Sequence, residues 1–170
     1  NTPEVVENIN ESKHLVDDVF EDVRDAILGL RCLPKSVSGS MDEVQDYLST
    51  YGAHHDIDVQ FLANERDFQM LDCESILQVG RIIDEAVVNS CKHASADHVW
   101  ISSGVDKERF WVSVEDDGVG IDWDKVNHLQ DDHFGIKIMK ERAESAGGHL
   151  TIEDRDAGGT RVILEIPIKR

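Results

Sequence analysis

The stretch RFWVSVEDDGVG, residues 109–120, passes from a regular β pattern into an acidic loop that holds two glycines. Its first eight residues alternate apolar and polar side chains with the period of two expected of a β-strand. The segment HVWISSGV, residues 98–105, alternates in the same way, and DKE between the two segments is typical of a turn. The sequence therefore predicts an antiparallel strand pair that leads into the glycine loop.

Helices and strands interleave on both sides of this pair. Residues 73–94 carry a broad apolar face at helical spacing, which predicts a long helix. The other expected elements are a helix at 40–52 capped by Ser40, strand 57–63, a strand or turn at 67–71, a mobile polar loop at 122–134, a helix at 135–147 ended by Gly147-Gly148, and strands 149–154 and 160–168. This order predicts an α+β fold built as a two-layer α/β sandwich.

Residues 3–31 predict one long helix, because their apolar residues recur in alternating steps of four and three. The apolar face is wider than a two-stranded seam, which favours a helical bundle with a partner helix from another copy or from missing sequence. The alternative is that this helix packs on its own globular domain. Leu33-Pro34 ends the helix, so we expect two parts, residues 1–34 and residues 35–170.

The composition narrows the possible partners. The chain has 170 residues and a formal net charge of -18, which argues against nucleic-acid binding because that needs clustered Lys and Arg. A nucleotide is still possible, since a bound divalent metal can reverse the local charge. Cys32, Cys73 and Cys91 form no C-x-x-C pair and predict reduced thiols in a cytosolic protein. A run of about 18 apolar residues is absent, so no membrane span is predicted.

The segment DEAVVNSCKHA, residues 84–94, places three polar side chains on one stripe of the predicted helix. Glu85, Asn89 and Lys92 stand at i, i+4 and i+7. An amide oxygen suits Mg²⁺, which keeps most of its water ligands and relies on substrate phosphates, and an ammonium group suits the phosphates themselves. The alternative is an ordinary solvated helix face.

The loop DDGVG does not match the common glycine-rich sites. Trp123 breaks the G-x-G-x-x-G pattern of a dinucleotide site, a G-K-S/T ending is absent, and Ser113 stands where a calcium loop needs its first Asp. A buried Asp116 at the strand end could accept a hydrogen bond from the exocyclic amine of adenine. Gly118 and Gly120 would then let the purine lie against the backbone. The alternative is an acidic turn.

Two later glycine segments complete the candidate site. Gly135 stands at the start of a predicted helix, where free N–H groups favour phosphate, and Lys137 and Arg142 are nearby cations. GGT, residues 158–160, predicts a tight turn between strands, for which a plain hairpin turn is the simpler interpretation of Gly158.

These segments together resemble the histidine kinases, in the variant typical of the nitrate-sensor-type subfamily. Glu85-x-x-x-Asn89-x-x-Lys92-His93, Asp116-x-Gly118-x-Gly120, HFGIKIMKERA and GGT follow one another as the N box and glycine boxes do, and the resemblance covers residues 75–170. It implies a Bergerat-type ATP site, a mixed sheet backed by helices. The implied roles are Glu85 and Asn89 in catalysis, Asn89 on Mg²⁺, and Lys92, Asp116, Gly118, Gly120, Gly135, Ile136 and Thr160 in nucleotide binding.

The resemblance also implies a function and partners. We expect an ATP-binding catalytic domain of a sensor histidine kinase, which presents ATP and Mg²⁺ to a histidine on a dimerisation bundle. Residues 1–34 would be part of the bundle helix, through which the full protein would form a homodimer. The implied partner is a response regulator, and the implied location is cytoplasmic. His14 is the only histidine there, and its neighbours do not match the acceptor motif. The alternatives are a GHKL-type ATPase that closes as a dimer and a degenerate module that only dimerises.

Overall fold

The computed structural model describes residues 41–121 and 134–168. The chain divides into two units, and all described residues belong to the second of them, Ser38–Arg170. The predicted helix 3–31, the predicted boundary after Pro34, the Ser40 cap and nearly all of the predicted loop 122–134 lie outside the described residues.

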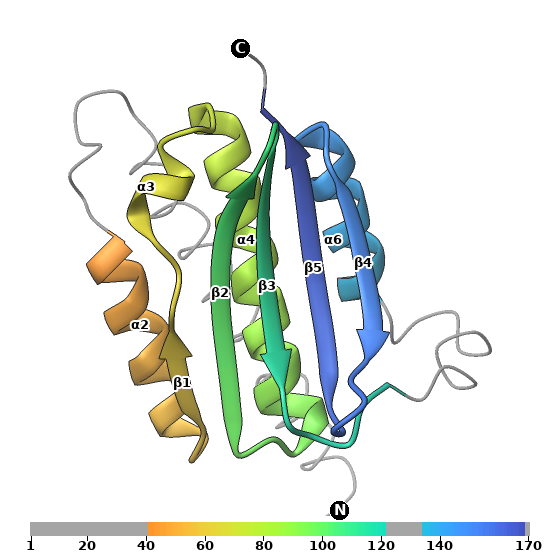
Figure 1. Cartoon of the computed structure of the whole chain (residues 1–170). Coiled ribbons are helices and arrows are strands. Elements are labelled where there is room, and N and C mark those ends of the chain that lie inside the picture. Colours follow the sequence, from red (N-terminus) through yellow and green to blue (C-terminus); the bar gives the residue numbers. More distant parts are fainter. Residues whose placement is uncertain (1–40, 122–133, 169–170) are drawn as a thin grey trace, which may run out of the picture. The chain divides into compact units, whose positions relative to one another are not determined.

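A mixed five-stranded sheet forms one layer of the fold, with the strand order β1-β2-β3-β5-β4 (Figure 1). The strands are β1 (Asp58–Phe61), β2 (His98–Asp106), β3 (Arg109–Asp116), β4 (His149–Asp154) and β5 (Thr160–Pro167). β1 pairs with β2 in parallel, and the other three pairings are antiparallel. The predicted antiparallel pair of β2 and β3 is therefore confirmed.

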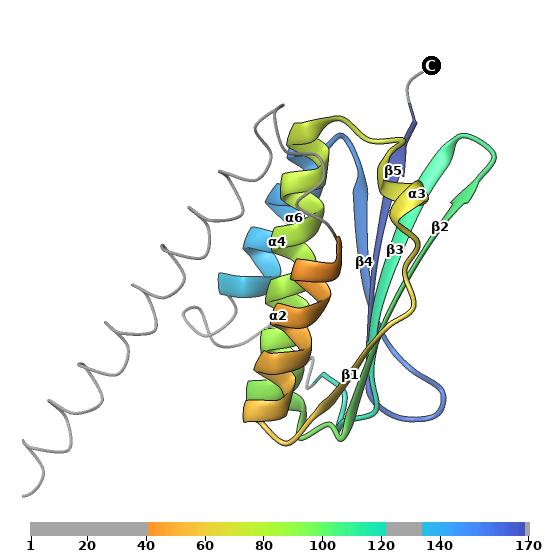
Figure 2. The ribbon, with the colours of Figure 1, turned by 90° about the vertical axis from the view of Figure 1, so that its left-hand side faces the viewer.

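Helices form the second layer and cover one face of the sheet, so the predicted two-layer α/β sandwich is confirmed (Figure 2). They are α2 (Met41–His54), α4 (Cys73–Asn89) and α6 (Phe134–Ser145). The short α3 (Glu65–Phe68) follows β1 and lies beside the strands, apart from this layer (Figure 2). One π-helical turn, η1 (Ser90–Ala94), continues α4. Within residues 41–121 and 134–168, no helix combines the length and the apolar character that crossing a membrane requires.

Local sequence signals explain where these helices begin and end. Asp72 caps α4, because its side chain accepts a hydrogen bond from the N–H of Ser75 at 2.7 Å. α6 is followed by Gly147 at φ +69°, a left-handed conformation that suits glycine. The strand alternative for residues 67–71 was wrong. Asn64 caps α3 there, and its side chain accepts from the N–H of Arg66.

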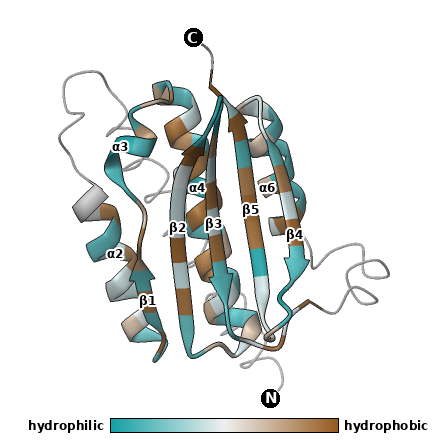
Figure 3. Ribbon diagram, in the orientation of Figure 1, coloured by the Kyte–Doolittle hydropathy of each residue, from teal (hydrophilic) through white to brown (hydrophobic). Residues whose placement is uncertain are grey.

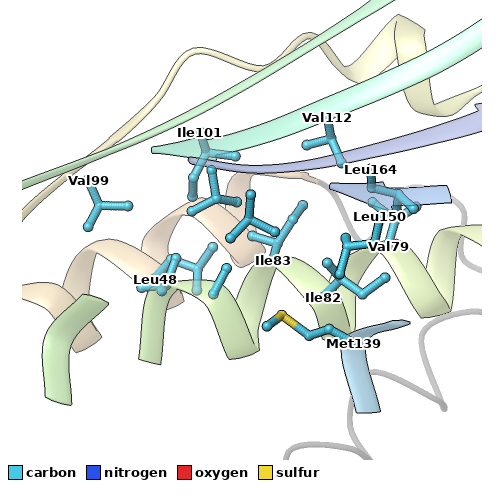
Figure 4. Packing of buried hydrophobic residues seen from close by; sticks show 14 of the residues in the cluster. Leu48, Val79, Ile82, Ile83, Val99, Ile101, Val112, Met139, Leu150 and Leu164 are labelled. Atoms are coloured by element: carbon cyan, nitrogen blue, oxygen red, sulfur yellow. The ribbon is translucent and has the colours of Figure 1, made fainter. Parts of the chain in front are cut away.

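The core lies between the two layers. Apolar and polar residues alternate along β2 and β3 (Figure 3), and the apolar side chains of β3 face the helices. Figure 4 shows residues of this cluster from several elements, among them Val79, Ile82 and Ile83 of α4, Ile101, Val112 and Leu164 of the sheet, and Met139 of α6. The core therefore fixes the C-terminal end of α4 beside the end of β3 and the start of β5, where the candidate site lies.

Candidate functional site

Asp116, the last residue of β3, is 4% exposed and stands at the centre of the site. Its Oδ1 accepts hydrogen bonds from the N–H of Gly118 at 2.9 Å and the N–H of Thr160 at 3.1 Å. Its Oδ2 accepts one from the hydroxyl of Ser90 at 3.0 Å. A buried carboxylate is costly without such donors. Three donors from three separate segments therefore hold this side chain and compensate for its burial.

Ser90 was missing from the predicted site residues. It is 4% exposed and opens the π-helical turn η1, directly after Asn89. Such turns are rare and occur frequently at functional sites. The only signal in the sequence was a hydroxyl residue inside the segment NSCKHA, and ideal α-helical spacing does not predict that it turns toward β3.

Gly118 and Gly120 are required by contacts within the protein. A Cβ on Gly118 would collide with the carbonyl oxygen of Ala94, and the next residue, Val119, donates its N–H to that same oxygen at 2.8 Å. Gly120 has φ +78°, and a Cβ there would lie 2.9 Å from Oδ1 of Asp154. We predicted these glycines as room for a purine, and their packing against η1 and the β4–β5 turn is a further reason for them.

The turn between β4 and β5 closes the site on its other side. Gly158 and Gly159 have φ of +92° and +93°, and a Cβ on Gly159 would collide with the backbone carbonyl of Asp116. This close approach brings the N–H of Thr160, which is 8% exposed, to the Asp116 carboxylate. Thr160 therefore contacts Asp116 directly through its backbone.

A second group of predicted residues meets on the helical layer. The side-chain amide of Asn89 donates to Oε1 of Glu85 over a long 3.5 Å, and both residues are half-buried. A Cβ on Gly135 would collide with this same Glu85 oxygen, and it would lie 3.7 Å from Nδ2 of Asn89. The start of α6 therefore lies against the predicted catalytic pair.

Lys92 and Ile136, two further predicted nucleotide-binding residues, lie on η1 and α6. Lys92 is exposed and lies in η1, so the wider π turn takes it out of ideal α-helical phase with Glu85 and Asn89. Ile136 is half-buried and packs against the core cluster.

The two cations expected near Gly135 have other partners. The ammonium group of Lys137 lies 3.9 Å from Glu141, and both side chains are exposed. Arg142 donates to the backbone carbonyl of Arg81 on α4 at 3.4 Å. Arg142 therefore ties α6 to α4.

A histidine–aspartate pair braces the loop that begins at Asp116. Asp117 accepts the N–H groups of Asp97 and His98 on Oδ1, and its Oδ2 lies 2.8 Å from the His98 ring. This hydrogen bond is the main cause of a raised pKa at His98. Partial burial would raise the pKa of Asp117, but the hydrogen bonds from His98 and Asp97 outweigh it and lower that pKa.

Comparison with known proteins gives concordant matches. A family model described as "Histidine kinase-, DNA gyrase B-, and HSP90-like ATPase" matches residues 74–170. DegS of Brevibacillus brevis, a signal transduction histidine-protein kinase/phosphatase, is 29% identical over 97% of this chain and 42% of its own length. The nitrate/nitrite sensor protein NarQ of Escherichia coli is 37% identical over 55% of this chain and 16% of its own length. The chain thus spans less than half of each relative.

Solved structures show the same fold. The ATP binding domain of PrrB from Mycobacterium tuberculosis superposes with a TM-score of 0.56 at 19% identity, over 75% of this chain and 93% of that domain. The blue-light activated histidine kinase of Erythrobacter litoralis EL346 gives a TM-score of 0.67 at 21% identity, over 91% of this chain and 50% of that one.

Proposed function

We propose that the Asp116 carboxylate binds the adenine of ATP in this chain. The chain belongs to the histidine kinase-, DNA gyrase B- and HSP90-like ATPase family and is an ATP-binding catalytic domain of the histidine kinase type. The observation that carries the proposal is the Asp116 carboxylate. Two backbone N–H groups occupy Oδ1, while the Ser90 hydroxyl is the one donor from the described residues on Oδ2. A carboxylate oxygen accepts more than one hydrogen bond, so Oδ2 retains capacity for the exocyclic amine of adenine.

We assign the phosphate end to the group at Glu85, Asn89 and Gly135. The amide of Asn89 donates through Nδ2 toward Glu85, which leaves its amide oxygen as the atom able to bind a cation. Among residues 41–121 and 134–168, no three or more His, Cys, Asp or Glu side chains gather as a metal site. The amide oxygen of Asn89 fits a Mg²⁺ ion whose other ligands are phosphates and water. Mg²⁺ so bound would neutralise charge on the phosphates.

The proposed reaction of the whole protein is transfer of the ATP γ-phosphoryl group to a histidine of a dimerisation bundle, and then to an aspartate of a response regulator. Phosphoryl transfer depends chiefly on positioning and charge neutralisation. Asn89 would orient the phosphates, and Glu85, which accepts a hydrogen bond from Asn89, would act as a base. A homodimer and a location on the cytoplasmic side, where ATP is available, belong to the same proposal.

Calorimetry with a non-hydrolysable ATP analogue and Mg²⁺ tests this assignment. We expect the wild type to bind and Asp116→Asn to lose about ten- to hundredfold in affinity, since hydrogen bonds to a charged group contribute about 1.5–3 kcal/mol. Asp46→Asn on α2 removes the same charge from an exposed position and serves as the matched control. The proposal fails if the wild type does not bind, or if Asp116→Asn and Asp46→Asn bind alike.

A further inference from the structure

Arg155 joins two parts of the candidate site from the face of the sheet that lies away from the helices. It follows β4 directly, and its side chain is 18% exposed. Its guanidinium lies 5.0 Å from the ring centroid of Trp100 on β2. The neighbours of Trp100 in β2, Val99 and Ile101, are buried toward the helices, so Trp100 lies on the opposite face, and Arg155, which contacts its ring, lies there too.

The contacts of Arg155 converge on the end of β3 and on the glycine turn. Nη1 donates to the backbone carbonyl of Asp116 at 2.5 Å and lies 3.4 Å from the carbonyl of Gly158. Nε pairs with Glu115 at 3.0 Å. The backbone of Arg155 also holds the turn, because its N–H donates to Gly159 at 2.9 Å and its carbonyl accepts from Gly158 at 3.0 Å.

We infer that Arg155 is a positioning residue for purine recognition, which locks the Gly158–Thr160 turn against β3 so that the Thr160 N–H meets the Asp116 carboxylate. This inference rests on the proposed role of Asp116. Arg155 itself is separated from the carboxylate by the backbone, since it binds the carbonyl of Asp116 and not the side chain. It therefore acts on the purine through Asp116 and Thr160.

The chemistry of this contact requires an arginine. One planar guanidinium here stacks on an indole, pairs with a carboxylate through Nε and donates to a carbonyl through Nη1. A lysine ammonium is a point charge on a flexible stem and cannot hold all three partners in that geometry. Arg161 also pairs with Glu115, at 3.1 Å, so the charge of Glu115 remains neutralised when Arg155 is replaced.

A purely structural ion pair would behave differently. Removal of such a pair would lower the stability of the domain, and it would weaken the binding of all nucleotides by the same factor. A positioning residue that acts on the adenine contact should also change the preference for adenine over guanine, because guanine presents a carbonyl oxygen where adenine presents an amine. The ratio of the two affinities is therefore the discriminating measurement.

The experiment measures the affinities of ATP and GTP analogues for the wild type, Arg155→Lys, Arg155→Gln and Arg109→Gln. Arg109 pairs with Glu165 on the same sheet face, away from the site, and is the matched control. We expect Arg155→Gln to lose about tenfold in ATP-analogue affinity and most of its ATP-over-GTP preference, in the range of a charge-assisted hydrogen bond. Arg155→Lys should be intermediate, and Arg109→Gln should match the wild type.

Amide hydrogen exchange without nucleotide supplies a second readout. We expect Arg155→Gln to speed exchange at the Thr160 N–H and to leave exchange in the α4 core unchanged. Wild-type affinity and preference in a folded Arg155→Gln protein, with slow exchange at Thr160, would overturn this inference alone. A wild type that binds no ATP analogue would instead overturn the proposed function and, with it, the purine role of Arg155.

Discussion

Glycines at three positions differ in what an added methyl group would contact. The difference indicates whether packing within the protein requires the glycine. At Gly118 a Cβ collides with the backbone of Ala94, which cannot move without disturbing η1. At Gly135 it collides with the far end of the flexible Glu85 side chain. At Gly80, inside α4, it meets no atom within 4 Å.

Alanine substitutions at these positions should therefore rank in a definite order. We expect Gly118→Ala to lower the free energy of unfolding by about 1–3 kcal/mol, as overpacking does. Gly135→Ala should cost about 1 kcal/mol or less, because Glu85 can swing away, while still weakening binding of the ATP analogue. Gly80→Ala should raise the free energy of unfolding by about 0.5–1 kcal/mol through helix propensity. Urea denaturation measures all three, and a loss at Gly80 equal to that at Gly118 would contradict this ranking.

The His98–Asp117 pair predicts a pH-dependent term in stability. The folded state raises the pKa of His98, chiefly through its hydrogen bond with Asp117, so it favours the protonated ring. The resulting stabilisation is fully present below the ordinary histidine pKa of about 6.5 and is lost as pH rises through the raised value. Asp117, whose pKa is lowered, stays ionised throughout that range.

Denaturation of wild type and His98→Asn from pH 5.5 to pH 9 tests this term. We expect the difference in unfolding free energy to shrink as pH rises, because the wild type loses the charged partner that the variant never has. His149→Asn, at an exposed position on β4, is the control. A difference that stays constant over the whole range would show that protonation of His98 contributes nothing.

At the scale of elements, the π-helical turn η1 decides the geometry of the site. It keeps Ser90 and Ala94 buried, so that one residue reaches Asp116 and the other receives the N–H of Val119. The same turn holds Cys91 half-buried against the core. Burial raises the pKa of the Cys91 thiol to about 11, although nearby Lys92 opposes the shift.

Thiol labelling tests this placement. Because the thiolate is the reactive form, a pKa of about 11 should slow alkylation of Cys91 at pH 8. We expect a rate on the order of a hundredfold below that of the denatured chain. Iodoacetamide labelling followed by mass spectrometry, in a Cys32→Ser background, measures it with exposed Cys73 as the internal reference. Equal labelling of Cys91 and Cys73 in the native protein would refute the buried turn.

At the scale of the whole molecule, the proposed adenine site lies at one end of the sheet. The C-terminal end of α4, the end of β3 and the start of β5 lie there (Figure 1), and the start of α6 meets α4 farther along, beside Glu85. His14, the only histidine of residues 1–34, is followed by Leu15 and not by the acidic residue of the histidine kinase acceptor motif, and His55-Asp56 follows α2 within the catalytic domain. The domain would then present ATP to an acceptor that it does not itself carry.

This division of labour predicts binding without self-labelling. Incubation of the chain with γ-labelled ATP and Mg²⁺ should leave no acid-labile, base-stable phosphohistidine on it, while the ATP analogue binds in calorimetry. The control is the same incubation with an added dimerisation bundle that carries an acceptor histidine, which we expect to become labelled. Phosphohistidine on the isolated chain, His14 included, would refute the prediction.

Much of the fold was predictable because its signals are local. The β2–β3 pair, the helix from Cys73 and the helix after Gly135 each follow from periodicity and capping within one segment. Asp116, Gly118 and Thr160 were also predicted, and the structure brings them together. The short helix α3 was missed, because one turn of helix leaves too few residues to show a period.

Ser90 and Arg155 depended on tertiary structure. Their roles arise from a π turn and from a side chain that reaches over the sheet to Asp116, 39 positions earlier in the chain. The sequence by itself determined the strands, the helices and the polar residues at their ends, since hydrophobic period and capping act over a few residues. Only the tertiary structure decided which donors meet the Asp116 carboxylate, because burying a charge is compensated by groups that packing brings from distant segments.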